Sequence, residues 1–275
     1  HLKKQAKDLL AAHGKGDAAA IARFREFLPA AAIEGQAGGS GWRLHDAQSC
    51  VARQYGFPSW RELSSFVTAR RARSADRNRR ILDWLQLVYP GETGGGMNRA
   101  SPAAAARMLE EEPDLPGDDP YLACAVGNAA VLRELTERDA GWVDRPGGPL
   151  DLPPLVAVTH SGLIRLPACR NRLHACARLL LDAGADPDQA IGSRWPPASA
   201  ERPSTKDRLS ALYGAAGQHR DPVLTKLLLD AGANPNDGES LYHSLENPAC
   251  TRLLLEAGAR VSGSNALYRA LDLDS

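Results

Sequence analysis

Three segments in the second half of the chain are nearly copies of one another, and this self-similarity constrains the fold most strongly. They read RLLLDAGADPD at 178–188, KLLLDAGANPN at 226–236 and RLLLEAGARVS at 252–262. Each is a leucine-rich helical run that stops at a glycine, where a left-handed backbone can end a helix, and continues as a short polar turn. A recurring helix end predicts a chain built from similar units.

A second element recurs beside these helix ends. Leu-Tyr opens a short helix in LYGAAGQH at 212–219, LYHSLENP at 241–248 and LYRALDLD at 267–274. Helix pairs therefore alternate along the chain. Positions equivalent to Leu179 occur four further times between Met108 and Leu253, which gives a mean step of about 36 residues.

This pattern resembles the ankyrin repeat, whose period is about 33 residues. The GADPD and GANPN segments match the helix-end turn of that family, and Leu-Tyr stands where the family usually has Leu-His. The resemblance implies an all-α, ankyrin-like repeat solenoid with short hairpin loops over 81–275, consisting of about five units and an incomplete sixth. Because such an array normally closes with a polar unit, we expect the natural protein to continue or to use its open end for a partner.

Residues 1–72 lack repeat character and form a separate helical region in our interpretation. Helices are predicted at 2–12, 17–28, 44–55 and 59–68, with Asp17 and Ser59 as caps. The stretch at 44–67 resembles the helical extension that precedes ankyrin arrays in many bacterial proteins. We expect this region to cover the first repeat with apolar faces that include Trp42, Tyr55, Phe57 and Trp60.

The net charge of zero hides an asymmetry. Residues 1–80 carry 15 Lys and Arg against 7 Asp and Glu, or +8, and the rest carries 18 against 26, or −8. Part of the positive charge lies in an Arg-rich junction at 73–80, which can be a solvated face or pair with acidic residues 110–112.

The basic end raises DNA binding as a third hypothesis for the function. Gln48, Ala52 and Gly56 have helix-turn-helix spacing, but Glu62 stands where that motif needs an apolar residue. The second helix offers only Arg61 to reach base edges. We therefore do not expect nucleic acid as the partner.

Two insertions interrupt the third unit. About ten residues separate its helices, and 189–208 lengthen the turn that follows. Long connections often carry function. Trp195 in this turn is either an interface anchor or a cover for the side of the stack.

For the binding surface, the resemblance implies hairpin tips and exposed inner-helix residues that line a concave face. The candidate binding residues are His160, Ser161, Arg194, Trp195, Gln218, His219, Glu246, Asn247 and Asp272. This mixed, mildly acidic set favours a polar or basic protein or peptide partner. We expect Tyr213, Tyr242 and Tyr268 to pack between units.

The alternative function is an enzyme or small-molecule binder whose insertions form a pocket near His160 and His219. No catalytic motif accompanies the histidines, so no catalytic residue is assigned. The five scattered cysteines are expected to be reduced thiols, and Cys169, His174 and Cys176 lack the paired spacing of a zinc site. We expect no metal and no cofactor.

No apolar run approaches the roughly 20 residues that span a bilayer, so we expect a cytoplasmic protein without a membrane partner. The first hypothesis is thus a non-enzymatic protein-interaction module. The sequence leaves its oligomeric state and its biological process open.

Overall fold

A computed structural model describes residues 1–28, 41–72 and 76–273. The structure is mostly helical, with 62% helix and 3% strand, which confirms the all-α class. Its small antiparallel sheet was not predicted: β1 (Ala190–Gly192) pairs with β2 (Arg208–Ser210), with Ile191 opposite Leu209.

The four helices predicted for the N-terminal region are all present. They are α1 (Leu2–Gly14), α2 (Ala18–Phe27), α4 (Leu44–Gln54) and α5 (Trp60–Arg71). Both predicted caps form, because Asp17 accepts a hydrogen bond from the Ala20 amide at 2.7 Å and Ser59 accepts one from the Glu62 amide at 3.3 Å.

Of the four aromatic residues predicted to cover the first repeat, Trp60 lies in α5 and lines a groove with Gln86 and Leu87 of α6, whereas Trp42 and Tyr55 do not contribute to this cover. The Trp42 ring lies 4.9 Å from that of Phe24, so Trp42 packs inside the bundle of α1, α2 and α4. Tyr55 is 50% exposed. The helix that contacts the remainder of the chain is α5, which buries Leu63 and Phe66.

A buried carboxylate holds α5 to the next part of the chain. Glu62 accepts a hydrogen bond from the Ala104 amide at 3.0 Å, and Ala104 lies in the first turn of α8 (Pro102–Glu111). A carboxylate at this position accepts a hydrogen bond from an otherwise unpaired helix amide and balances the partial positive charge of the helix N-terminus. Glu62, the residue that departs from the helix-turn-helix pattern, therefore caps α8 from a neighbouring helix.

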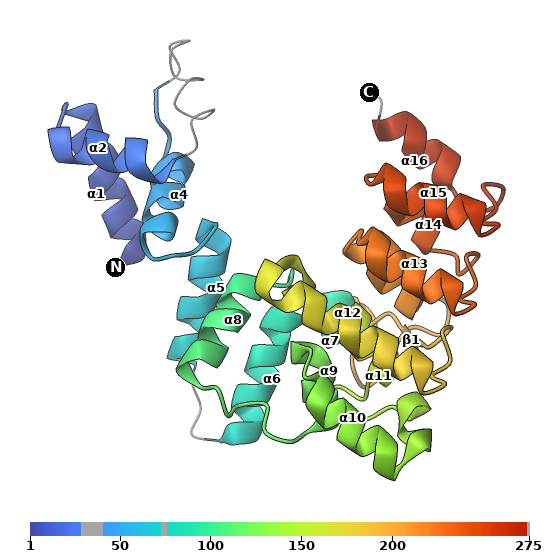
Figure 1. Ribbon diagram of the computed structural model, residues 1–275. Helices are drawn as coiled ribbons and strands as arrows, with labels where there is room; N and C mark the ends of the chain where they lie inside the picture. The colour runs from blue at the N-terminus through green and yellow to red at the C-terminus, as the bar shows by residue number, and fades with distance from the viewer. Residues whose placement is uncertain (29–40, 73–75, 274–275) are drawn as a thin grey trace.

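Beyond α5, the chain forms a series of short helices. They are α6 (Arg77–Val88), α7 (Gly91–Gly94), α8, α9 (Pro120–Val126), α10 (Ala129–Arg138), η2 (Ala140–Asp144), α11 (Pro154–Thr159), η3 (Gly162–Arg165), α12 (Pro167–Asp182), the π-helical η4 (Tyr213–Gln218), α13 (Pro222–Asp230), α14 (Ser240–Ser244), α15 (Pro248–Glu256) and α16 (Ala266–Leu273). The longer helices α10, α12, α13 and α15 pack successively side by side, and so do the shorter α9, α11, η4 and α14. The N-terminal helices and the C-terminal helices rise as two arms from a common base (Figure 1).

Equivalent hydrogen bonds join the turns that follow successive long helices. In each bond, the side chain of one turn accepts from a backbone amide of the next. The pairs are Asp144 with the Asp186 amide at 2.8 Å, Asp188 with the Asn234 amide at 2.7 Å, and Asn236 with the Arg260 amide at 2.8 Å. The similar sequences at these turns thus make similar contacts.

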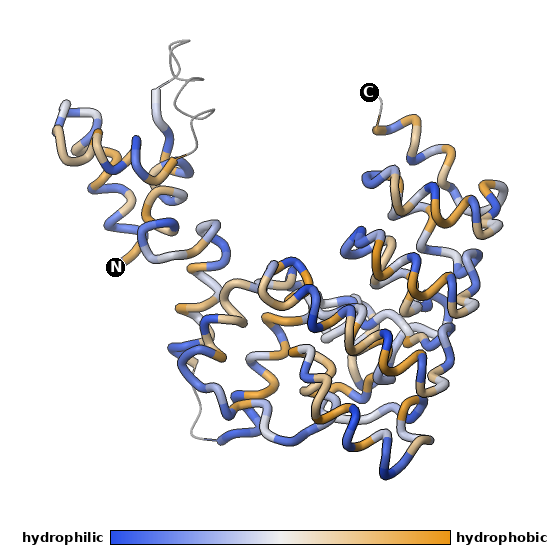
Figure 2. The backbone as a smooth tube through the Cα atoms, in the orientation of Figure 1, coloured by the Kyte–Doolittle hydropathy of each residue, from blue (hydrophilic) through white to orange (hydrophobic). Residues whose placement is uncertain are grey.

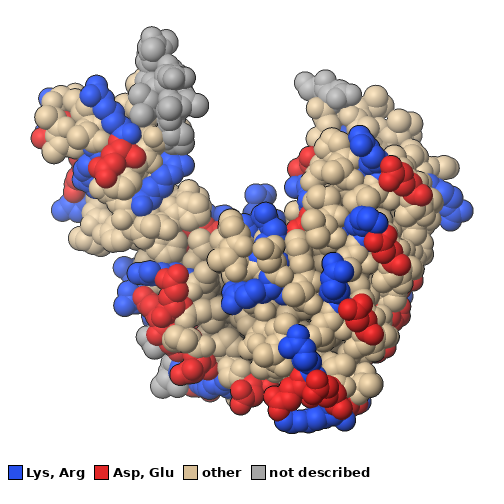
Figure 3. Space-filling model, viewed as in Figure 1, with Lys and Arg blue, Asp and Glu red and all other residues tan. Residues whose placement is uncertain are grey.

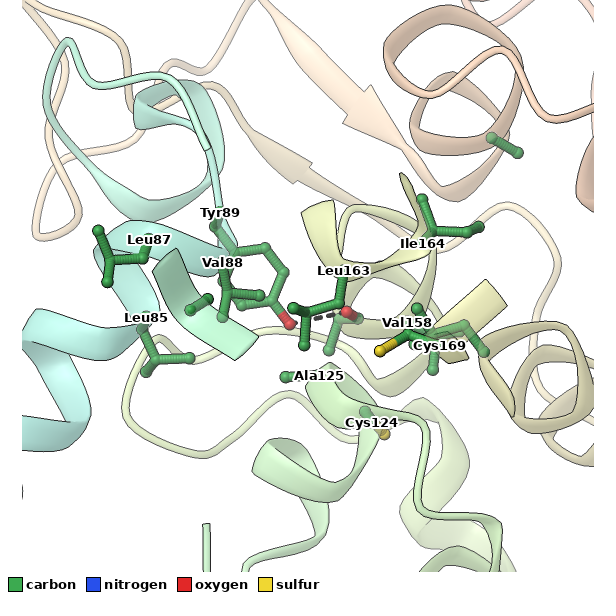
Figure 4. Packing of buried hydrophobic residues seen from close by; sticks show 14 of the residues in the cluster. Leu85, Leu87, Val88, Tyr89, Cys124, Ala125, Val158, Leu163, Ile164 and Cys169 are labelled. Atoms are coloured by element: carbon green, nitrogen blue, oxygen red, sulfur yellow. Dashed lines mark hydrogen bonds between the residues drawn. The ribbon is translucent and has the colours of Figure 1, made fainter. Parts of the chain in front are cut away.

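The core runs through the base of the two arms. Apolar residues recur along the packed helices (Figure 2). Figure 4 shows Val88 of α6 near Leu163, and the Tyr89 hydroxyl donates to the Ala157 carbonyl at 2.7 Å. Because Trp84 also donates to the Ala105 carbonyl at 3.2 Å, the polar atoms of both large aromatics are satisfied.

The arginines around the predicted junction pair with acidic side chains, as one of the two sequence interpretations proposed. Arg70 lies 3.7 Å from Glu111, and Arg80 lies 3.2 Å from Glu112. Residues 73–75 lie outside the described part of the chain. Much of the basic excess in this segment is thus neutralised within the chain.

The repeated turns also give the first prediction, which concerns backbone conformation. Gly184 has a φ of +92°, whereas Gly14 has no positive φ, and an added Cβ meets nothing within 4 Å at either residue. Gly184→Ala should therefore lower the free energy of unfolding by about 1 kcal/mol through backbone strain alone. The matched Gly14→Ala variant should not be destabilised. Equal urea midpoints for the two variants would contradict this account.

Candidate functional site

His160 lies inside the protein rather than on a concave surface, so its assignment as a binding residue was wrong. It ends α11 and is 0% exposed. Its Nδ1 lies 3.1 Å from the Thr93 hydroxyl of α7, and its Nε2 lies 2.9 Å from the Ser210 carbonyl of β2. Burial lowers its pKa to about 4. A neutral ring that donates from Nε2 and accepts at Nδ1 satisfies both contacts.

Ser161 and Arg194 are also buried and were wrongly assigned to the surface. The Ser161 hydroxyl donates to the Ala125 carbonyl at 2.7 Å, at the end of α9. The Arg194 guanidinium donates to the carbonyls of Thr93 at 3.2 Å and Leu150 at 2.7 Å. These side chains fix the insertion and α11 to neighbouring elements instead of meeting a partner.

His219 has an unusual environment at the end of η4. The residue is partly exposed, yet both ring nitrogens are inaccessible and have no hydrogen-bond partner among the described residues. Burial, and then the charge of Arg165, lower its pKa to about 3. His219 is therefore neutral near pH 7 and cannot readily exchange a proton with a substrate.

Glu246 and Asn247 do lie together beside η4, as predicted, but their charge is already balanced. Glu246 lies 2.8 Å from Arg220 and 3.0 Å from Arg269. The Asn247 amide donates to the Arg220 carbonyl at 2.8 Å, and its Oδ1 caps α15. The mild acidity expected at this position is thus cancelled by arginines.

Two other predicted residues are exposed. Trp195 is 48% exposed in the long connection between β1 and β2, and Asp272 is exposed on α16. The tyrosines behave unequally. Tyr213 is buried and donates to Glu92 at 3.0 Å, whereas Tyr268 is 73% exposed and packs against no following unit within the described residues.

Sequence reasoning missed an arginine cluster beside the same elements. Arg165 ends η3 and donates to the Gln218 carbonyl at 3.3 Å. Partial burial, and then the charges of Arg61 and Arg220, lower the pKa of Arg165, so these cations lie close enough to repel one another. Counting charge over whole halves of the chain hid the cluster, because residues 81–275 are acidic as a set.

The cysteines are buried and unpaired in the structure: Cys50, Cys124, Cys169, Cys176 and Cys250. Within residues 1–28, 41–72 and 76–273, no group of three or more His, Cys, Asp or Glu side chains is arranged to hold a metal ion. No helix in the same part of the chain has the length and apolar character needed to cross a bilayer.

Comparisons of the chain with protein-family models, curated proteins and solved structures found no match. The function of this chain is therefore inferred from its own residues and contacts.

Proposed function

We propose that the chain is a protein–protein interaction module, built as an ankyrin-like repeat solenoid with an N-terminal helical cap, that acts in the cytoplasm. The observation that carries this proposal is the set of equivalent bonds between successive turns, such as that from the Asn234 amide to Asp188 at 2.7 Å. Units that repeat both sequence and contacts form an extended scaffold, and such scaffolds offer concave surfaces to partners.

The environments of the two histidines weaken the enzyme alternative. A general acid or base must reach the proton that it transfers. His160 uses both ring nitrogens in buried contacts, and the ring nitrogens of His219 are inaccessible. These were the two groups that the pocket hypothesis depended on.

The packing of α5 weakens the DNA alternative. A recognition helix must present its side chains to the major groove. Glu62, Leu63 and Phe66 of α5 are instead buried, and Arg61 donates to the Ala100 carbonyl at 2.6 Å. The face that would read bases is used for packing against α8.

Site-specific photo-cross-linking tests the interaction proposal. A photoreactive phenylalanine placed at Trp195 or Glu246, both exposed, should give a discrete cross-linked partner in cells. The same group at Arg252, which is exposed on the long helix α15, serves as the control and should give little. Equal yields of the same products at all three positions would reject a partner surface on the concave side.

A further inference from the structure

Arg61, Arg165 and Arg220 form a cluster of arginines from three elements. Arg165, at the end of η3, donates to the Gln218 carbonyl, two residues before Arg220. Arg61 of α5 donates to the Ala100 carbonyl, just before α8, and α8 packs against η3. In Figure 3, basic side chains gather on the floor of the hollow between the arms. η3 leads directly into α12, whose N-terminal end lies at that floor in Figure 1.

The acidic side chains near these arginines neutralise only part of the cluster. Glu62 lies 3.6 Å from Arg61, but it is 4% exposed and also caps α8. Glu246 is shared between Arg220 and Arg269, at 2.8 Å and 3.0 Å. Arg165 donates to the Gln218 carbonyl, which carries no charge to balance the guanidinium. The local field is therefore positive, although the surrounding repeats are acidic.

A groove lined by both apolar and polar residues adjoins the cluster, and Arg61 belongs to both. The groove has a volume of about 590 Å³ and lies between α5, α6 and the segment before α8. Its apolar lining includes Trp60 and Leu87, and its acidic residue Asp83 is paired with Arg79 at 3.0 Å. Arg99, Ser64 and Thr68 can bond to an extended peptide, whereas other polar groups of the lining already bond within the chain. The volume falls within the range of ligand sites, about 300–1,000 Å³.

We propose that this surface, formed by the α5–α6 groove and by Arg61, Arg165 and Arg220, binds an acidic segment of a partner protein. The proposal deepens the interaction function and depends on it. It also reverses the sign of the partner expected from the sequence, because Glu246 in the candidate set is already paired with Arg220 and Arg269. Guanidinium groups bind carboxylates with directional, charge-assisted hydrogen bonds.

The distribution of charge favours an acidic peptide over a nucleic acid. A nucleic acid is held by many phosphate contacts along a continuous basic track. Here the arginines are few, and residues 81–275 carry 18 basic against 26 acidic side chains, which would repel a long polyanion. A short acidic segment contacts the cluster without meeting that surrounding field.

Fluorescence anisotropy with the full chain tests the proposal. The probe is a labelled Ser/Gly peptide of about twelve residues with Glu at every third position, which spaces the carboxylates by about 10 Å in an extended chain. A peptide with Lys in place of each Glu, a duplex DNA and a single-stranded RNA serve as comparisons. We expect binding of the Glu peptide, a loss of affinity on adding salt, and no binding of the Lys peptide.

Arg165→Glu should weaken binding of the Glu peptide by about tenfold or more, since a charge contact is replaced by repulsion. Arg252→Glu makes the same charge change on the exposed face of α15 and should keep wild-type affinity. Arg165→Gln should give a smaller loss in the same direction. Circular dichroism checks that each variant is folded, which we expect because the Arg165 side chain is exposed.

Three outcomes would overturn the acidic-peptide proposal: equal effects of Arg165→Glu and Arg252→Glu, binding of the Lys peptide, or tighter binding of nucleic acid that depends on Arg165. Rejection of the acidic-peptide proposal can be distinguished from rejection of the interaction function. Cross-links at Trp195 and Glu246 do not depend on the charge of the partner, so they would persist if only the acidic-segment proposal were wrong.

Discussion

His160→Ala is expected to lower the free energy of unfolding by about 4 kcal/mol. The substitution removes the partner of the Thr93 hydroxyl and of the Ser210 carbonyl, and both groups are buried. It also leaves a cavity beside Gly214. The His160 ring packs so closely against Gly214 that a Cβ added to this glycine would lie 2.6 Å from the ring. Urea unfolding followed by circular dichroism measures the loss.

His45→Ala is the matched control for this prediction. The His45 side chain is 69% exposed, so its removal should change the free energy of unfolding by less than about 0.5 kcal/mol. If His160→Ala were as stable as His45→Ala, the contacts of His160 would not be structural. His160 would then again be a candidate residue for the enzyme or small-molecule-binder alternative.

Acid is expected to destabilise the folded protein through its buried histidines. Burial lowers the pKa of His160 from 6.5 to about 4. As the pH falls below about 6.5, the unfolded chain gains a proton at this residue and the folded chain does not. The free energy of unfolding therefore falls with pH, and the contribution of neutral His160, roughly 3 kcal/mol when complete, is lost by about pH 4.

His219 acts in the same direction, because burial and then Arg165 lower its pKa to about 3. Its contribution is smaller than this shift alone suggests, since the residue is partly exposed. Glu62 and Glu92 act in the opposite direction. Burial raises the pKa of each carboxyl, so the folded state takes up their protons first as the pH falls.

Unfolding titrations between pH 7 and pH 5 separate these contributions. The dependence of unfolding free energy on pH should become shallower by up to about 1.4 kcal/mol per pH unit in His160→Gln, and by less in His219→Gln. An unchanged slope in both buried-site variants would show that these histidines titrate normally.

The features predicted well from the sequence are those set by near neighbours in the chain. A Leu-rich run before Gly184 or Gly232 fixes a helix and its left-handed end, and both glycines have positive φ. The N-terminal helices follow from caps and breakers within each segment. The bonds between turns follow from the repetition itself, because equal sequences in adjacent units place equal groups side by side.

The burial of the site residues could not be predicted because it depends on distant segments. His160 contacts Thr93 and Ser210, which are 67 and 50 residues away in the sequence. Arg194 bonds to Leu150, 44 residues away, across an insertion that has no counterpart in the repeat pattern. Likewise, no local signal brings Arg61 near Arg165 and Arg220, since their proximity depends on how α5 packs against α8.

The bond from the Ala104 amide to Glu62 also defines where a shortened chain could begin. A fragment starting at residue 81, where the repeat pattern begins, would lack both this carboxylate and the apolar cover of Leu63 and Phe66. The Ala104 amide in the first turn of α8 would then lose its side-chain acceptor, and the face of α8 that packs against α5 would be exposed to water. The smallest autonomous folding unit that contains the repeats therefore includes α5 and starts no later than its cap, Ser59.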